Sequence, residues 1–256
     1  MGMEKWLLAG ATVMAVLGGG LGILSLQRGQ RSRWTLVCML GAFLLQLGFL
    51  GIRGEQRGQC PLGDFGEILV FLAWSLVLFY LLVGPVYRVS LLGMFTAPLV
   101  AVFQLVALFP GMIDPAPEHV EFTDGWRETH SAFAVLSYGA FALAAVAGLM
   151  FIVLNRQLKG QQLGTGLFRN LPPVRNLVAS VVRLATLGAG LLTIGVVSAF
   201  QMAEGAAGIH RNVAVVTWAA YLILLGVYFW RGITPKRLSL LVIVMFTLSL
   251  LVFAFV

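Results

Sequence analysis

The amino-acid sequence predicts an all-α fold, a polytopic membrane helix bundle of about eight transmembrane helices that forms a single integral membrane domain over residues 1–256. Hydrophobic residues make up 59% of the chain and charged residues only 11%, whereas soluble domains carry about 25% charged residues. Apolar stretches long enough to cross a bilayer as a helix recur along the whole sequence. This composition excludes a soluble globular enzyme and a disordered chain.

Each expected span is an apolar stretch bounded by charge, glycine or proline. The first is followed at once by arginines and by no A-x-A-like cleavage site, so we expect an uncleaved anchor. The second ends near Arg53, and a tight Gly84-Pro85 turn separates the third from the fourth. The eight spans are expected near residues 6–26, 34–52, 65–83, 86–109, 129–154, 176–201, 212–230 and 238–256.

The loops around the later spans differ in charge. An acidic, proline-rich loop over residues 110–128 precedes the fifth span, and a basic loop over residues 155–175 precedes the sixth. His210 and Arg211 stand just before the seventh span, and Lys236 and Arg237 just before the eighth. None of these connections is long enough to hold a soluble domain, so any function must be carried out within or against the bilayer.

The charges predict the orientation. If the N-terminus faces outward, successive connections between the spans alternate between the two sides of the membrane. The inner side then holds eleven basic residues and no acidic residue, and the outer side holds five basic residues and all ten acidic residues. This asymmetry is typical of a protein whose basic loops stay in the cytoplasm. We therefore expect a multi-pass protein of the inner (cytoplasmic) membrane with both termini on the outer side. The net charge of +7 comes from these flanks, so no nucleic-acid partner is expected.

Two histidines begin polar stripes that run inward from the outer end of a span. His130 is seven residues before Ser137, which adjoins Tyr138, and His210 is seven residues before Thr217. A spacing of seven puts two residues on the same face of a helix. Two imidazoles at equal depth on different helices could ligate a haem iron. The competing interpretation is a pair of interfacial histidines that bond to loop carbonyls.

Arginines accompany both histidines. Arg127 precedes His130 by one turn and Arg211 follows His210 directly, where they could pair with haem propionates. Motifs for other chemistry are missing from the sequence: it contains no G-x-S-x-G, H-E-x-x-H, phosphate-binding loop, CxxC or CxxCH. We therefore predict no enzymatic activity and no covalent haem attachment.

The segment from His130 to Phe141, HSAFAVLSYGAF, resembles the H-x6-S-Y-x-x-F segment of the cytochrome c assembly membrane proteins. The stretch from Arg183 to Gly195 resembles the helix that follows in that CcsA/ResC superfamily. His210-Arg211 before Thr217-Trp218 resembles its smaller HemX/YpjD-like branch.

In the larger relatives, outer-face histidines are associated with haem and flank a W-G-x-x-W-x-W-D loop. His130 matches the first of these histidines, but residues 204–210 stand where that loop would be. The resemblance thus implies haem binding, and it does not extend to delivery of haem to an apocytochrome.

These observations predict a haem-binding, haem-handling membrane protein of the superfamily, with haem near the outer leaflet and a membrane or cytochrome-maturation protein as partner. The predicted iron ligands are His130 and His210, and the other predicted cofactor-binding residues are Arg127, Arg211, Ser137 and Tyr138. The alternative is a structural or regulatory membrane subunit that binds no haem and acts through a partner, as resemblance to the HemX branch implies for the tetrapyrrole pathway.

Overall fold

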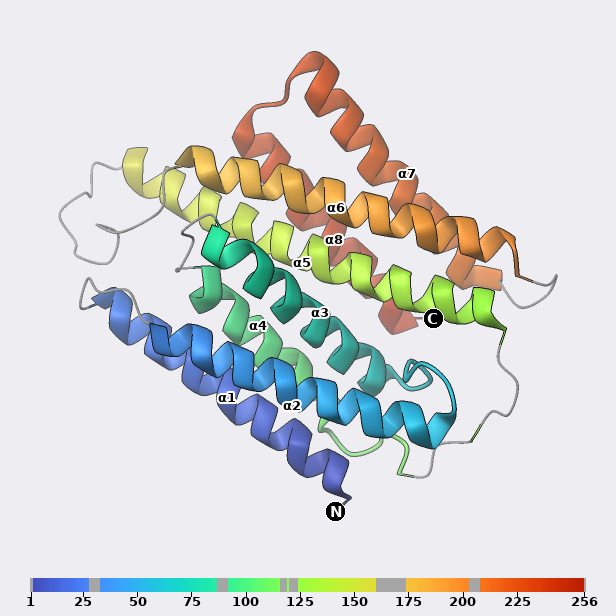
Figure 1. Cartoon of the computed structure of the whole chain (residues 1–256). Coiled ribbons are helices and arrows are strands. Elements are labelled where there is room, and N and C mark those ends of the chain that lie inside the picture. The colour runs from blue at the N-terminus through green and yellow to red at the C-terminus, as the bar shows by residue number, and fades with distance from the viewer. Residues whose placement is uncertain are drawn as a thin grey trace. The chain divides into compact units, whose positions relative to one another are not determined.

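The computed structural model is all-helical over the residues it describes, which are 2–27, 33–86, 92–115, 119, 124–159, 174–202 and 208–255. It confirms the predicted helix bundle, with one helix for each expected span (Figure 1). The helices are α1 (Met3–Gln27), α2 (Arg33–Arg57), α3 (Phe65–Val86), α4 (Leu92–Ala107), α5 (Gly125–Lys159), α6 (Val174–Phe200), α7 (Gly208–Arg231) and α8 (Pro235–Phe255).

Six of the described helices are long and apolar enough to cross a membrane: α1, α2, α3, α5, α6 and α7. Helix α4 is shorter, with 16 residues and Pro98 in its interior. Large apolar side chains such as Leu44 and Ile223 are exposed within these helices, as expected for surfaces that face lipid. Exposed tryptophans stand near helix ends, including Trp6, Trp34 and Trp230, where indole rings favour the membrane–water interface. The chain is therefore a multi-pass membrane protein.

Two helix ends differ from the prediction. Helix α2 continues to Arg57, five residues beyond the end of the expected span at residue 52, because its last turn carries charged side chains that are paired rather than solvated. The expected turn at Gly84-Pro85 is wrong, since α3 continues to Val86. A proline in the last turn of a helix removes only one hydrogen bond, and a preceding glycine tolerates the helical conformation.

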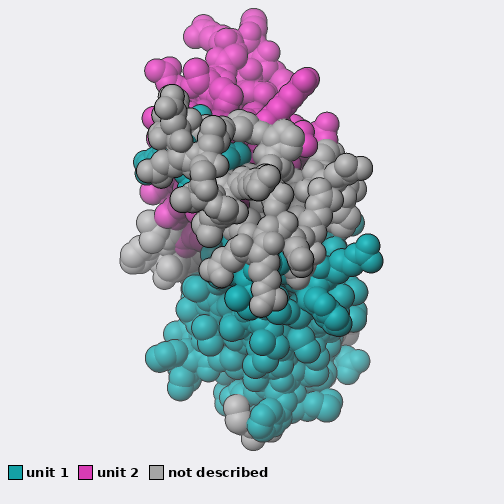
Figure 2. All heavy atoms as spheres, turned by 90° about the vertical axis from the view of Figure 1, so that its left-hand side faces the viewer, with its two compact units in different colours: residues 1–121, 154–173 teal, residues 122–153, 174–256 magenta. Residues whose placement is uncertain are grey.

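The chain divides into two compact units, coloured separately in Figure 2. Unit 1 comprises residues 1–121 and 154–173, and therefore holds α1 to α4 with the C-terminal end of α5. Unit 2 comprises residues 122–153 and 174–256, and holds most of α5 with α6, α7 and α8. The prediction that residues 1–256 form a single membrane domain stays a prediction.

In unit 1, α1 packs closely on α2 and on α4, and α3 packs on α4. Glycines make the close approach between helices. A Cβ at Gly18 of α1 would lie 3.2 Å from the side chain of Cys38 on α2, and one at Gly93 of α4 would lie 2.5 Å from the Tyr80 hydroxyl on α3. The two cysteines of the chain, Cys38 and Cys60, are not joined by a disulfide bond.

In unit 2, two glycines of α6, Gly188 and Gly195, face α5. They are seven residues apart and therefore lie on the same face of the helix. A Cβ at Gly188 would lie 2.5 Å from the Phe141 ring, and one at Gly195 would lie 3.3 Å from the backbone nitrogen of Ala134. At both positions glycine allows the α6 backbone to approach α5 closely. Gly190, which lies between them in sequence, has no atom within 4 Å of such a Cβ.

Candidate functional site

His130 lies in the second turn of α5 and is almost fully buried, with 8% of its surface exposed. Its Nδ1 atom is 2.8 Å from the carbonyl oxygen of Gly195 on α6. A carbonyl only accepts hydrogen bonds, so this contact requires the proton on Nδ1. The other ring nitrogen, Nε2, then carries the lone pair. Metal-ligating histidines are held in this way, with one ring nitrogen donating to a backbone carbonyl and the other bound to the metal.

Gly195 makes this geometry possible. A Cβ at this position would lie 3.4 Å from the backbone oxygen of His130, an ordinary contact, and 3.3 Å from the Ala134 nitrogen, a tight one. Even the smallest side chain would therefore meet the α5 backbone directly. The glycine allows the α6 backbone to reach the imidazole, so one helix fixes the ring orientation of a histidine on another.

Ser137 and Tyr138 continue inward on α5, and both are buried. The Ser137 hydroxyl donates to the carbonyl of Ala134 at 2.6 Å, within its own helix. The Tyr138 hydroxyl donates instead to the Thr217 hydroxyl of α7 at 3.4 Å. The structure therefore brings together the two polar stripes that sequence analysis had placed on separate helices.

Aromatic contacts extend this region further along α5 and α7. The rings of Phe141 and Tyr221 stack with centroids 3.7 Å apart and planes 5° apart. The indole nitrogen of Trp218 donates to the Thr193 hydroxyl of α6 at 2.8 Å. Aromatic rings and hydroxyls thus link α5, α6 and α7. Sequence analysis did not single out Thr193.

The remaining predicted site residues lie at the ends of helices. Arg127 is exposed in the first turn of α5. The Arg211 guanidinium lies over the ring of Phe200 at 5.9 Å from the centroid, an example of cation–π contact. His210 belongs to the first turn of α7 rather than to the loop before it, and its side chain lies outside the described residues. Its role as a second ligand stays a prediction.

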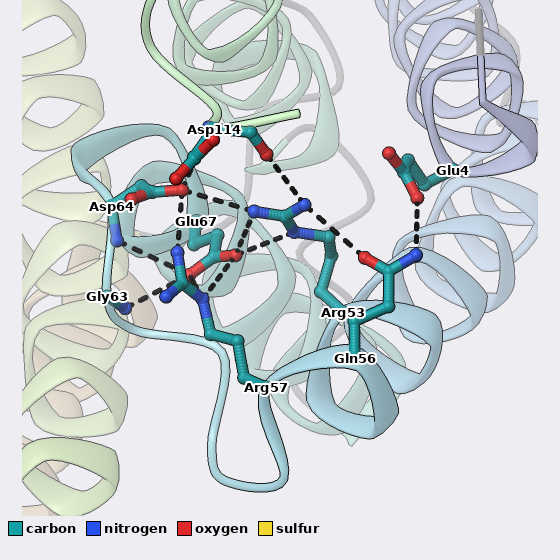
Figure 3. A network of polar contacts seen from close by, with 8 residues as sticks. All are labelled: Glu4, Arg53, Gln56, Arg57, Gly63, Asp64, Glu67 and Asp114. Carbon is teal, nitrogen blue, oxygen red and sulfur yellow. Dashed lines mark hydrogen bonds and ion pairs between the residues drawn. The ribbon is translucent and has the colours of Figure 1, made fainter. Parts of the chain in front are cut away.

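Unit 1 contains a charged cluster that sequence analysis did not anticipate (Figure 3). Arg53 and Arg57 at the end of α2 face Asp64 and Glu67 at the start of α3. The Arg53 Nε lies 2.7 Å from one Glu67 oxygen, and the Arg57 Nε lies 2.8 Å from the other. Both side chains of the Arg53–Glu67 pair are fully buried. Two positive and two negative charges meet there, so the cluster is neutral.

The cluster also holds the chain that follows α4. Arg53 donates to the Asp114 carbonyl at 2.8 Å, and the Asp114 backbone nitrogen donates to Asp64 at 3.0 Å. Gln56 donates to Glu4 of α1 at 3.0 Å, so α1, α2, α3 and the segment that follows α4 are tied together at this end (Figure 3).

Two sequence signals could have revealed this cluster. Arg53 and Arg57 are four residues apart and share a helix face. Asp64-x-x-Glu67 has the spacing of a capping box, and Glu67 does accept the Asp64 backbone N–H at 3.3 Å.

The described residues contain no group of three or more His, Cys, Asp or Glu side chains that could hold a metal ion. A site for a bare ion such as zinc is therefore absent from this part of the chain. A haem iron needs only one or two protein ligands, because the porphyrin supplies the others. His130, whose Nε2 has no hydrogen-bond partner among the described residues, fits that smaller requirement.

The helices and these two polar regions define a class, the multi-pass helical membrane proteins with polar groups buried among their helices. Comparison with known proteins defines the family. The sequence profile described as "Cytochrome C assembly protein" matches residues 62–256, which is most of the chain. The chain therefore belongs to the cytochrome c assembly protein family.

Curated relatives are similar to this chain over different lengths. The Cytochrome c biogenesis protein CcsA of Thermosynechococcus vestitus is 26% identical over 259 residues, covering 81% of either chain. The CcsA of Chlamydomonas reinhardtii is 28% identical over 86% of this chain and 66% of its own length. The CcsA of Crocosphaera subtropica is 31% identical over half of this chain, and that match spans 41% of the relative. Assignment to the smaller HemX/YpjD-like branch stays a prediction.

Proposed function

We propose that this protein is a non-enzymatic haem-handling component of cytochrome c assembly, located in the cytoplasmic membrane with both termini outside. Haem would be held near the outer leaflet, with His130 as a ligand to its iron. One observation carries the proposal: the Nδ1 atom of His130 lies 2.8 Å from the Gly195 carbonyl, so Nε2 is available to iron.

The surrounding residues supply the rest of the site. Tyr138, Phe141 and Tyr221 offer buried aromatic surface below the histidine. Arg127, one turn before His130, is exposed and free to meet a propionate. We propose that His210 would supply a second ligand to the iron. When bound, haem would supply an iron centre for redox chemistry or transfer, whereas the chain would bind, orient and shield it.

The names of the relatives support this function, because the CcsA proteins are described as cytochrome c biogenesis proteins. We infer by analogy that this chain works with a membrane or cytochrome-maturation partner. Because residues 204–210 replace the tryptophan-rich loop, we propose that the protein stores or passes on haem and that a partner presents it to an apocytochrome.

The test is an absorption spectrum of the purified protein, oxidised and dithionite-reduced, with haem quantified as the pyridine haemochrome. The wild type is expected to show a Soret band and sharp reduced α and β bands. His130→Ala should lose or shift them, and added imidazole should restore them in part, since it can occupy the vacated ligand position. His119→Ala is the matched control, because His119 is an exposed loop histidine whose Nδ1 contacts the Gln56 carbonyl.

An unchanged haem content and spectrum in His130→Ala would refute the ligand assignment. A colourless wild type that takes up no added hemin would refute haem binding altogether. That outcome would favour the alternative predicted from the sequence, a regulatory or structural subunit. Such a subunit should retain its partner on detergent purification even after His130 and His210 are both replaced.

A further inference from the structure

Gln46, Gln104 and Trp74 of unit 1 each have a buried polar group without a hydrogen-bond partner among the described residues. Gln46 of α2 and Gln104 of α4 are fully buried, and neither end of either carboxamide is bonded. The indole nitrogen of Trp74 on α3 is also buried and unbonded. Together they present three donor groups and two acceptor oxygens.

Helix geometry places two of these residues below the charged cluster. Gln46 is seven residues before Arg53, and Trp74 is seven residues after Glu67. Seven residues are two helical turns, about 10 Å, and return to the same face. Because Arg53 and Glu67 are in direct contact at 2.7 Å, Gln46 and Trp74 lie at equal depth on facing sides of α2 and α3.

An aromatic pair closes this layer on the side away from the cluster. Phe43 of α2 stacks on Trp74 of α3 with centroids 5.4 Å apart, which confirms that the two helices face each other here. Beyond it the buried residues include the apolar Met39, Leu76 and Val77, and the buried hydroxyls of Ser75 and Thr96 donate to carbonyls of their own helices. Gln104 stands on α4, one turn before that helix ends.

Such groups are costly when left unpaired. A buried amide without a partner gives up its hydrogen bonds to water and gains none in return, and a membrane core offers no solvent to satisfy it. The occupant that would satisfy these groups must be neutral, because the layer is neutral and the cluster above it balances two arginines against two carboxylates. It must also both donate and accept hydrogen bonds.

We propose that Gln46, Gln104 and Trp74 form an internal hydration site, in which ordered water molecules bridge the two carboxamides and the indole N–H beneath the Arg53–Glu67 pair. Water is neutral, small, and bonds to two to four polar partners when buried. The Asp64 side chain, 22% exposed, connects the charged cluster to solvent. The hydrated layer makes unit 1 polar at one end and dry beyond the Phe43–Trp74 stack.

Radiolytic footprinting tests this site, because hydroxyl radicals formed from ordered water oxidise the side chains beside it. In the intact protein in lipid nanodiscs, Trp74 should be oxidised rapidly despite its buried nitrogen. In Gln46→Leu/Gln104→Leu its rate should fall several-fold, since the water loses its partners. Trp218 of unit 2 is the internal reference and should not change.

Ser75→Ala is the matched control variant. Ser75 is fully buried on α3 next to Trp74, but its hydroxyl already donates to the Leu72 carbonyl at 2.9 Å. Removing it should leave the Trp74 oxidation rate unaltered. A Trp74 rate that is low in the wild type, or that is the same in the double leucine variant, would overturn the proposal.

A second measurement needs no variant in the site. In protein labelled with ¹⁵N-tryptophan, the Trp74 indole N–H should show a cross-peak to water, with the signal assigned by its loss in Trp74→Phe. A water-protected indole would overturn the hydration site. So would an organic molecule that co-purifies with the wild type and is lost from the double leucine variant, because the occupant would then not be water.

Discussion

The charged cluster of unit 1 predicts a large loss of stability on removal of a single charge. In Arg53→Met, Glu67 and Asp64 keep only Arg57 as a cationic partner, and the Asp114 carbonyl loses its 2.8 Å donor. Breaking a buried ion pair by removal of one partner costs about 3–5 kcal/mol, because the remaining charge is left uncompensated. We therefore expect Arg53→Met to lower the free energy of unfolding by about that amount.

The double variant Arg53→Met/Glu67→Leu distinguishes charge imbalance from lost packing. It leaves Arg57 paired with Asp64 at 2.7 Å, so the cluster is again neutral. Its cost should be well below the sum of the two single variants, with a coupling free energy of about 2–3 kcal/mol.

The assay is reversible unfolding in mixed detergent micelles, followed by intrinsic fluorescence and fitted to the free energy of unfolding. Arg231→Met is the reference, because this arginine is exposed at the end of α7, and it should change stability by no more than about 0.5 kcal/mol. If Arg53→Met costs no more than Arg231→Met, or if the two single effects simply add, the reasoning about buried charge is wrong.

Two further predictions concern unit 2. Gly188→Ala places a methyl group 2.5 Å from the Phe141 ring, so it should destabilise the protein by about 1–3 kcal/mol and lower its thermal midpoint in detergent. Gly190→Ala is the control: its methyl group meets no neighbour, so the midpoint should stay unchanged or rise. Equal midpoints for the two variants would count against close α5–α6 packing. Tyr221→Phe removes a buried hydroxyl that has no partner among the described residues and keeps the ring stack. The thermal midpoint of this variant should therefore equal or exceed that of the wild type. A marked fall would mean that the hydroxyl is hydrogen-bonded in the folded protein.

The helices were predictable because membrane insertion is decided locally. A stretch of about 20 apolar residues is sufficient to specify a span, so α1, α5 and α7 all contain their predicted segments. The ends were less predictable. Helix α2 continues to Arg57 because its terminal arginines find carboxylates on α3, and hydropathy carries no information about that pairing.

The candidate haem site was predicted only in outline. The spacing of His130 and Ser137 placed both on one helix face, and the resemblance to the cytochrome c assembly proteins singled out the histidine. The acceptor for its ring could not be predicted, because Gly195 lies 65 residues away. Its selection depends on how closely α6 approaches α5, which is a property of helix packing.

Sequence alone thus determined the class of protein, the order of its helices and the family segment around His130, because these follow from local hydropathy, charge and motif. The tertiary structure decided which polar groups are satisfied. It paired Arg53 with Glu67 and gave His130 a backbone acceptor. It left the buried side chains of Gln46 and Gln104 without a hydrogen-bond partner among the described residues. The physical reason is that a hydrogen bond between helices depends on their relative rotation and distance, which neither helix's own sequence specifies.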